Sequence, residues 1–290
     1  MDIGIIGIGL MGQAFVERFR SQGYKVRAFN RSPEKIKNLK DSDVILCNSA
    51  DELIRSSSTI ILMLSDADAI NDLLQLEQQS DQGKFLQGKT IIQMATISPS
   101  QSKQIAQVIS SYGSHYLEAP VLGSIPEADT GTLIIMAGGS RDVFENALPV
   151  LQALGNSPRY IGDIGSAAAL KLAMNQLIAS LTAGFSLSLG YALKNGVDTD
   201  LFMDTVRESA LYAKTYDKKL QKYLDRDFGK ANFSTRHLLK DIRLFIEDAK
   251  AAGLNTDALE GIERITSQTV ENGMDLMDYS SIYQQICPEK

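Results

Sequence analysis

Short apolar runs alternate with amphipathic helical patterns along the first half of the chain, and longer helical patterns fill the second half. The strands predicted in the first half are Asp2–Ile6, Lys25–Phe29, Val44–Leu46, Thr59–Leu64, Thr90–Met94, His115–Glu118 and Leu133–Ala137. The helices predicted between them are Met11–Gln22, Pro33–Leu39, Asp51–Arg55, Ala67–Leu76, Pro99–Ser110 and Val143–Leu154. This alternation is typical of βαβ units, so we expect an α/β domain built on a doubly wound parallel sheet.

The strand signals end near Gly162. The helices predicted beyond it are Ala167–Asn195, Thr199–Ser209, Lys214–Leu224, Arg236–Ala252, Asp257–Asn272 and a short one near Tyr279. We therefore expect one domain at residues 1–163 and an all-helical second domain at 164–290. The long helix that begins at this boundary is predicted to form the spine of the second domain.

That long helix carries a single charge, Lys171, before Lys194. Its length could span a membrane, but polar residues such as Asn175 and Gln176 are spread around it, which is too polar for a lone lipid-facing span. We interpret it as a buried helix. Lys171 and Asn175 share one face. The lysine is either a functional group or a side chain whose ammonium reaches water along its apolar stem.

Composition and charge argue against several classes of protein. Of the 290 residues, 44% are hydrophobic and 22% are charged, and the net charge of −6 offers no basic excess for binding nucleic acid. Cys47 and Cys287 are too few for a disulfide framework, and no cysteine or histidine has the spacing of a metal site. We predict no metal, no signal peptide, no membrane partner and a cytoplasmic location.

The clearest motif is Gly7-Ile8-Gly9-Leu10-Met11-Gly12, a GxGxxG run between a predicted strand and a predicted helix. Its glycines permit a tight turn, a close approach of the backbone to pyrophosphate, and close packing of helix on strand. The helix N-terminus adds N–H groups and a positive dipole end. This context predicts a Rossmann dinucleotide-binding domain, the alternative being a glycine-rich turn that serves packing alone.

The end of the second strand indicates which dinucleotide binds. An NAD site usually has an acidic residue there to bond the ribose hydroxyl, but this chain has Asn30, Arg31 and Ser32. An arginine in place of a carboxylate favours the 2′-phosphate of NADP(H). The alternative is that Arg31 is an ordinary surface charge at a helix start.

Four motifs in order resemble those of the β-hydroxyacid dehydrogenase family, which includes 3-hydroxyisobutyrate dehydrogenases, and the resemblance covers essentially the whole chain. They are GIGLMG near the N-terminus, EAPVLGS at Glu118–Ser124, the Gly165-x5-Lys171-x3-Asn175 signature, and Lys240-Asp241. Within the family, NRS, MLSD at Met63–Asp66 and the stretch after Glu118 resemble glyoxylate/succinic semialdehyde reductases.

The resemblance implies roles for individual residues. Lys171 would donate a proton to the carbonyl oxygen as hydride arrives from the nicotinamide, and Asn175 would hold the lysine or the substrate oxygen. The remaining substrate-binding residues would be Leu122, Gly123, Ser124, Phe233 and Asp241. Besides the glycine-rich turn and Asn30–Ser32, the cofactor would meet Leu64, Ser65, Thr96 and Lys240.

Two departures from the family pattern affect the substrate. Leu122 stands where the family usually has serine, so one hydroxyl contact to a substrate carboxylate is missing. The lysine that the family has in the next stretch is also absent, because this chain reads Ser124-Ile125-Pro126-Glu127. Leu122 would make the pocket more apolar and favour a bulkier acid.

Together these observations predict an NADPH-dependent reductase of small aldehyde acids such as glyoxylate and succinic semialdehyde. Alternatives are a 3-hydroxyisobutyrate-type dehydrogenase and, outside enzymes, an NADP-binding sensor module. Imine reductases share the architecture, but Lys171 argues against them. The long apolar helix also suggests self-association, and the resemblance implies a homodimer or homotetramer.

Overall fold

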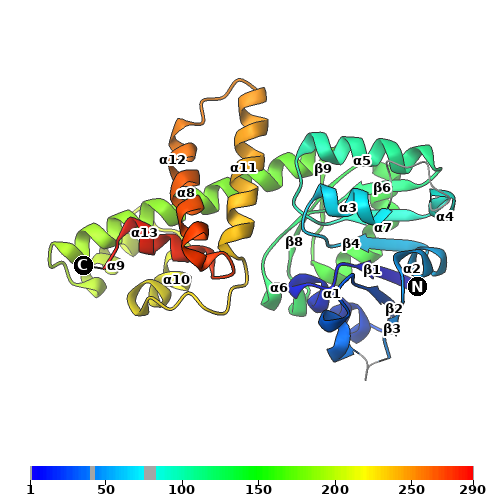
Figure 1. Ribbon diagram of the computed structural model, residues 1–290, viewed down its shortest axis with the longest axis horizontal. Coiled ribbons are helices and arrows are strands. Elements are labelled where there is room, and N and C mark those ends of the chain that lie inside the picture. The colour runs from blue at the N-terminus through cyan, green and yellow to red at the C-terminus, as the bar shows by residue number, and fades with distance from the viewer. Residues whose placement is uncertain (1, 40–42, 75–82, 290) are drawn as a thin grey trace. The chain divides into compact units, whose positions relative to one another are not determined.

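The alternation predicted for the first half is present in the structure, a computed structural model that describes residues 2–39, 43–74 and 83–289 (Figure 1). Within the described residues, nine strands form one sheet. They are β1 (Asp2–Ile6), β2 (Lys25–Phe29), β3 (Ile45–Leu46), β4 (Thr59–Leu62), β5 (Thr90–Gln93), β6 (His115–Glu118), β7 (Val121–Leu122), β8 (Ile134–Gly138) and β9 (Arg159–Gly162). Their spatial order is β3-β2-β1-β4-β5-β6-β8-β7, with β9 beside β8.

The first six strands run parallel in the Rossmann order 3-2-1-4-5-6, which confirms the expected fold class. β8 departs from this direction, since it pairs antiparallel with both β6 and β7 and parallel with β9. The sequence pattern did not predict β7 or β9, both of which pair with β8.

Helices cover both faces of the sheet, because successive strand side chains point to opposite sides. Ile5 in β1 packs into one core and Ile6 into the other. The first face is covered by α1 (Leu10–Ser21), α6 (Ile125–Thr130) and α7 (Arg141–Leu154). The second is covered by α2 (Ala50–Ser56), α3 (Ala67–Leu74), α4 (Gly83–Leu86) and α5 (Pro99–Ser111).

Most predicted helix boundaries agree with the structure to within a few residues. The segment Pro33–Leu39, which was predicted as a helix, forms the 3₁₀ helix η1. The predicted helix Ala67–Leu76 is present as α3 up to Leu74, and its last two positions lie outside the described residues. α4 and α6 were not predicted, since each is only four to six residues long.

The second half is helical, as expected. Its elements are α8 (Ser166–Lys194), α9 (Thr199–Glu208), α10 (Lys214–Asp225), α11 (Thr235–Ala251), α12 (Asp257–Thr269), η3 (Val270–Met274), η4 (Tyr279–Ile282) and α13 (Tyr283–Ile286). Two apolar clusters hold them together. One surrounds Phe185 and Tyr223, and the other surrounds Ala179, Leu238 and Ile242.

Helix α8 is 29 residues long, which corresponds to about 44 Å. By length and composition it could cross a membrane, as the core helices of globular proteins also could, and 44% of its most apolar window is buried within the protein. Backbone proximity divides the chain inside this helix into two compact units, Met1–Leu172 and Ala173–Lys290. Each unit is described by itself below.

Candidate active site

The glycine-rich turn joins β1 to α1, and two of its positions require glycine for packing. Gly7 has a φ of +97°, and a Cβ atom there would lie 2.3 Å from the carbonyl oxygen of Met63. A Cβ atom on Gly12 would lie 2.0 Å from the carbonyl oxygen of Gly7. A side chain at either position would therefore push α1 away from the sheet.

Gly9 has no such reason to be glycine. It caps α1 with ordinary extended dihedrals, φ −82° and ψ −164°, and a Cβ atom there would meet nothing within 4 Å. The absent side chain leaves open space in front of the first turn of α1, and Gly9 supplies no side-chain cap to its N–H groups. A bare backbone facing open space at a helix N-terminus suits the pyrophosphate of a dinucleotide.

Asn30 ties this turn to the end of β2. Its Oδ1 accepts the N–H of Ile8 at 2.9 Å, and its Nδ2 donates to the carbonyl oxygen of Ser32 at 2.9 Å. Both polar groups of the side chain therefore bind the protein and hold the glycine-rich turn beside the NRS segment. The neighbouring Arg31 side chain is exposed.

The other predicted cofactor residues of the first unit follow the carboxyl ends of adjacent strands. Leu64 and Ser65 follow β4, and Thr96 follows β5. Leu64 and Thr96 are half-buried, whereas Ser65 is exposed. Because β1, β4 and β5 run parallel, these residues lie at the same end of the strands as the glycine-rich turn. Ligands of open α/β sheets bind at this carboxyl end.

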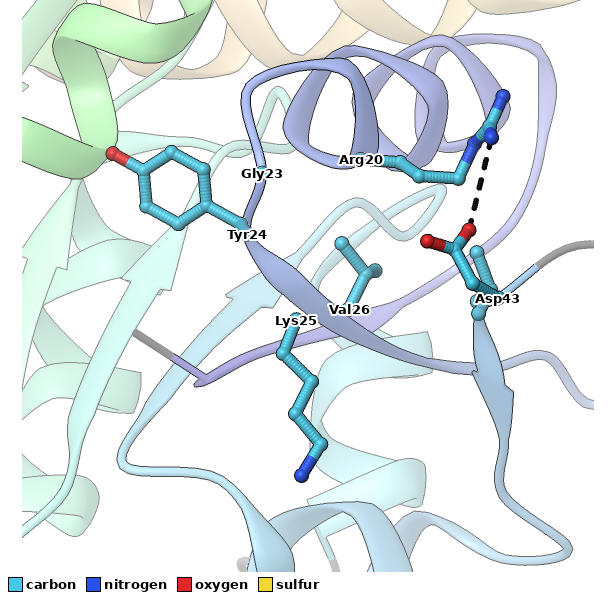
Figure 2. A pocket seen from close by; sticks show the side chains of 7 residues that line it. Arg20, Gly23, Tyr24, Lys25, Val26 and Asp43 are labelled. Atoms are coloured by element: carbon cyan, nitrogen blue, oxygen red, sulfur yellow. Dashed lines mark ion pairs between the residues drawn. The ribbon is translucent and has the colours of Figure 1, made fainter.

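A hollow of about 250 Å³ lies at the opposite end of the strands, beside the amino ends of β2 and β3 (Figure 2). Its lining comes from the end of α1 and the starts of β2 and β3: Arg20, Gly23, Tyr24, Lys25, Val26, Asp43 and Val44. Arg20 is already paired with Glu17 at 2.7 Å and with Asp43 at 3.7 Å. Dinucleotides bind at the carboxyl ends of the strands in such sheets, so this hollow at the amino ends is not a site for the dinucleotide.

The buried carboxylate of Glu118, at the end of β6, caps the start of α8. Its Oε1 accepts three backbone N–H groups, those of Gly165 at 2.9 Å, Ala167 at 2.8 Å and Ala168 at 3.2 Å. Its other oxygen accepts the hydroxyl of Ser102. Burial raises the pKa of Glu118, and the hydrogen bond from Ser102 and those from the backbone oppose the rise. Glu118, which is 47 residues before Gly165 in the chain, thus supplies the N-terminal cap of α8, because Gly165 has no side chain that could do so.

Lys171 lies on the second turn of the capped helix. Its Nζ donates to the carbonyl oxygen of Val121 at 2.7 Å. Val121 is three residues beyond Glu118, so the β6–β7 segment binds α8 twice. The hydrogen bond therefore places Lys171 Nζ on the residue that precedes the segment Leu122–Ser124. Leu122 is half-buried and pairs with Ile134 of β8.

In the second unit, Asn175 and Asp241 form a buried pair. Asn175 Nδ2 donates to Asp241 Oδ2 at 2.6 Å, and each residue is 3% exposed. Lys240 Nζ lies 3.1 Å from Asp241 Oδ1 in an ion pair. Asn175 Oδ1 is buried and accepts no hydrogen bond from the residues that the structure describes. Asn175, Lys240 and Asp241 thus form one network with an open acceptor.

Phe233, the predicted pocket wall, belongs to an aromatic cluster. Its ring stacks on His237 with centroids 6.3 Å apart and tilts against Tyr279 at 5.8 Å. The backbone N–H of Tyr279 donates to the carbonyl oxygen of Phe233 at 3.1 Å. No sequence pattern indicated Tyr279 as a support for Phe233, because the two residues are 46 positions apart along the chain.

No group of three metal-ligating side chains occurs within the ranges that the structure describes. The candidate groups of the first unit are the Lys171 ammonium and the backbone of the glycine-rich turn, and those of the second unit are the Asn175 amide, the Lys240 ammonium and the Asp241 carboxylate. This set matches hydride-transfer chemistry, in which a bound nicotinamide supplies the hydride and the protein supplies the proton.

Comparisons with known proteins match both parts of the chain. Residues 2–162 match the model of the NAD-binding domain of 6-phosphogluconate dehydrogenase, and residues 165–286 match that described as NAD-binding of NADP-dependent 3-hydroxyisobutyrate dehydrogenase. Glyoxylate/succinic semialdehyde reductase 1 of Arabidopsis thaliana is 30% identical, over 99% of this chain and 98% of that protein. The chain belongs to the β-hydroxyacid dehydrogenase family.

Other members of the β-hydroxyacid dehydrogenase family agree with this assignment. The chloroplastic glyoxylate/succinic semialdehyde reductase 2 of Arabidopsis thaliana is 26% identical, over 99% of this chain and 79% of that protein. The structure of 3-hydroxyisobutyrate dehydrogenase from Salmonella typhimurium shares the fold, with a TM-score of 0.86 at 21% identity, covering 98% of this chain and 99% of that one. The chain is thus an NAD(P)-dependent oxidoreductase, as the motifs predicted.

The cap on α8 gives the first testable prediction. Glu118→Ala leaves three buried N–H groups without an acceptor, so we expect the free energy of unfolding to fall by about 3 kcal/mol. Glu118→Gln is expected to retain most stability, because its amide oxygen can accept the same N–H groups and its NH₂ can donate to Ser102. Urea unfolding followed by circular dichroism measures both. Equal stability of Glu118→Ala and of the exposed control Glu145→Ala would contradict the capping role.

Proposed function

We propose that this β-hydroxyacid dehydrogenase is an NADPH-dependent reductase of small aldehyde acids, with glyoxylate and succinic semialdehyde as leading substrates. The observation that carries the proposal is the ammonium of Lys171, held 2.7 Å from the Val121 carbonyl oxygen beside the substrate motif. Full-length identity of 30% with an Arabidopsis glyoxylate/succinic semialdehyde reductase supports the substrate class.

Lys171 is proposed as the proton donor. Lys171 Nζ would give a proton to the carbonyl oxygen while the carbonyl carbon receives a hydride, the chemistry that NADPH would supply when bound, so that an aldehyde becomes a primary alcohol. Asn175, one turn further along α8, would accept a hydrogen bond from the Lys171 ammonium or from the hydroxyl formed in the reaction through its open Oδ1. Asp241 and Lys240 fix the Asn175 amide, and Phe233 forms an apolar wall of the substrate pocket.

The substrate carboxylate is proposed to bind at Leu122–Ser124. The backbone N–H groups around Gly123 and Ser124 would hold it, that of Ser124 in exchange for the Glu127 carboxylate that it binds in this structure, and Leu122 supplies an alkyl surface. A longer acid places more carbon against Leu122, so succinic semialdehyde suits this segment better than glyoxylate.

The proposed organisation follows from these roles. Residues 1–163 bind NADP(H), and residues 164–290 provide the substrate and dimerisation domain. Cys47 and Cys287 are both unpaired, which suits a cytoplasmic enzyme. A second candidate function is the oxidation of 3-hydroxyisobutyrate or a related 3-hydroxy acid, favoured by the match of residues 165–286 to the 3-hydroxyisobutyrate dehydrogenase model.

The reaction is tested by following the absorbance of NADPH with glyoxylate, succinic semialdehyde and, in reverse, 3-hydroxyisobutyrate. We expect oxidation of NADPH with the aldehyde acids. Lys171→Ala should lower kcat about 10²- to 10⁴-fold with unchanged NADPH affinity, because it removes the proton donor. Lys194→Ala, which removes an exposed lysine from the same helix, is the control. NADPH binding without turnover of any substrate would instead support a sensor module.

NADP preference is tested at Arg31. Arg31→Ala should weaken NADPH binding about 10- to 100-fold, because a charge-assisted contact to the 2′-phosphate is lost. NADH binding should change less than twofold, and the exposed Arg159→Ala should change neither. Isothermal titration calorimetry measures all four affinities. An equal loss for both cofactors would refute the 2′-phosphate assignment.

Self-association is proposed to use an apolar stripe on α8. Leu177, Leu187 and Tyr191 lie along it with 46%, 62% and 71% of their surface exposed, which is unusual for large apolar side chains on one helix. Exposed apolar surface of this kind marks protein–protein contacts, and a two-fold dimer would use the stripe twice. We propose a homodimer or homotetramer built on it.

Replacing two residues of the stripe tests the assembly. The double variant Leu187→Glu/Tyr191→Glu should have the mass of one chain by light scattering, whereas the wild type should have two or four times that mass. A dimer of the double variant would bury four added carboxylates at the stripe, two from each chain, which is strongly unfavourable. Leu254→Glu, at an exposed apolar residue on the α11–α12 loop, should keep the wild-type mass. A monomeric wild type would refute the proposal.

A further inference from the structure

Both donor groups of Ser124 are engaged by a carboxylate of the same chain. Ser124 N and Ser124 Oγ each lie 2.7 Å from Glu127 Oε2. Serine followed three residues later by glutamate is a capping pair at the start of α6. Here the capping pair coincides with the segment that the proposed function assigns to the substrate carboxylate.

The Glu127 side chain is built into this segment. Gly123 has a φ of +127°, and a Cβ atom there would lie 3.0 Å from Glu127 Cβ and 2.6 Å from Leu133 Cδ2. Glycine at this position thus leaves the space that the stem of Glu127 fills. The carboxylate is therefore held against Ser124 by packing as well as by hydrogen bonds.

A substrate carboxylate at Ser124 must compete with this internal one. It either displaces Glu127 and breaks two charge-assisted hydrogen bonds, or it lies beside a like charge. Each route weakens its binding. An uncharged end group meets neither cost and gains contact with Leu122. Val121 also lies one residue before this segment and holds the ammonium of Lys171, so the competition takes place next to the proposed proton donor.

We propose that Glu127 is a specificity-determining residue that lowers the preference of this enzyme for acids, so that uncharged aldehydes of the same length are also reduced. The inference rests on the proposed function, because that function places the substrate end group at Ser124. Glu127 acts on substrate binding and has no part in proton or hydride transfer.

The test compares succinic semialdehyde with butanal, which has the same chain length but no carboxylate. Glu127→Gln removes the charge while its amide oxygen can still accept both Ser124 donors. We expect the KM for succinic semialdehyde to fall about tenfold, which is the effect of removing roughly 1.4 kcal/mol of repulsion. The KM for butanal and both kcat values should change less than twofold.

Two further variants separate this effect from charge and folding. Asp129→Asn removes an exposed carboxylate from the same helix and should behave as the wild type. Glu127→Ala removes both carboxylate and stem and should also lower the KM for the acid. Thermal unfolding and NADPH affinity report whether each variant is folded.

The outcomes are distinguishable. An unchanged ratio of the two KM values in folded Glu127→Gln and Glu127→Ala, with wild-type turnover intact, overturns the inference and leaves the proposed function standing. No oxidation of NADPH by the wild type with either aldehyde overturns the proposed function and the inference with it. A fall in KM for the acid alone supports both.

Discussion

The buried carboxylate of Glu118 is the interaction on which the proposed active site depends. It gathers three N–H groups at the start of α8, and the helix direction from that point decides where Lys171 lies. The hydrogen bond from Lys171 to Val121 closes a second link between the same two segments. Unpaired N–H groups at a buried helix start would be costly. The placement of the proposed proton donor therefore depends on the carboxyl end of β6.

The features that the sequence predicted are those with local causes. Alternating strands and helices, the GxGxxG turn and the i, i+4 pair of Lys171 and Asn175 are all set within a few residues. The two-residue strand β7 could not be predicted, because it depends on its pairing with β8 elsewhere in the chain. The cap by Glu118 joins residues 47 to 50 positions apart, and the quoted motif contained Glu118 without indicating this role.

The Ser124–Glu127 contact is a different kind of omission. Serine and glutamate three residues apart are a recognisable capping signal, and their separation is local. The pair marks the start of α6, which the helical pattern of the sequence did not predict. Asn30, which was predicted to bind the cofactor, uses its side chain to bind Ile8 N and Ser32 O. It therefore organises the glycine-rich turn from inside the protein. Residues within a binding motif often support the site in this way.

Charges of opposite sign now bracket the segment Leu122–Gly123. The ammonium of Lys171 lies on the carbonyl before it, and the carboxylate of Glu127 lies on the N–H after it. A negatively charged substrate end group between them is attracted by the Lys171 ammonium and repelled by the Glu127 carboxylate. The selectivity for acids therefore depends on which of these two charges solvent screens less. Both charges are held in place, Glu127 by packing at the glycine turn and Lys171 by its hydrogen bond to Val121. Because Lys171 is also the proposed proton donor, we expect substrate range to evolve at Glu127 while Lys171 keeps the chemistry.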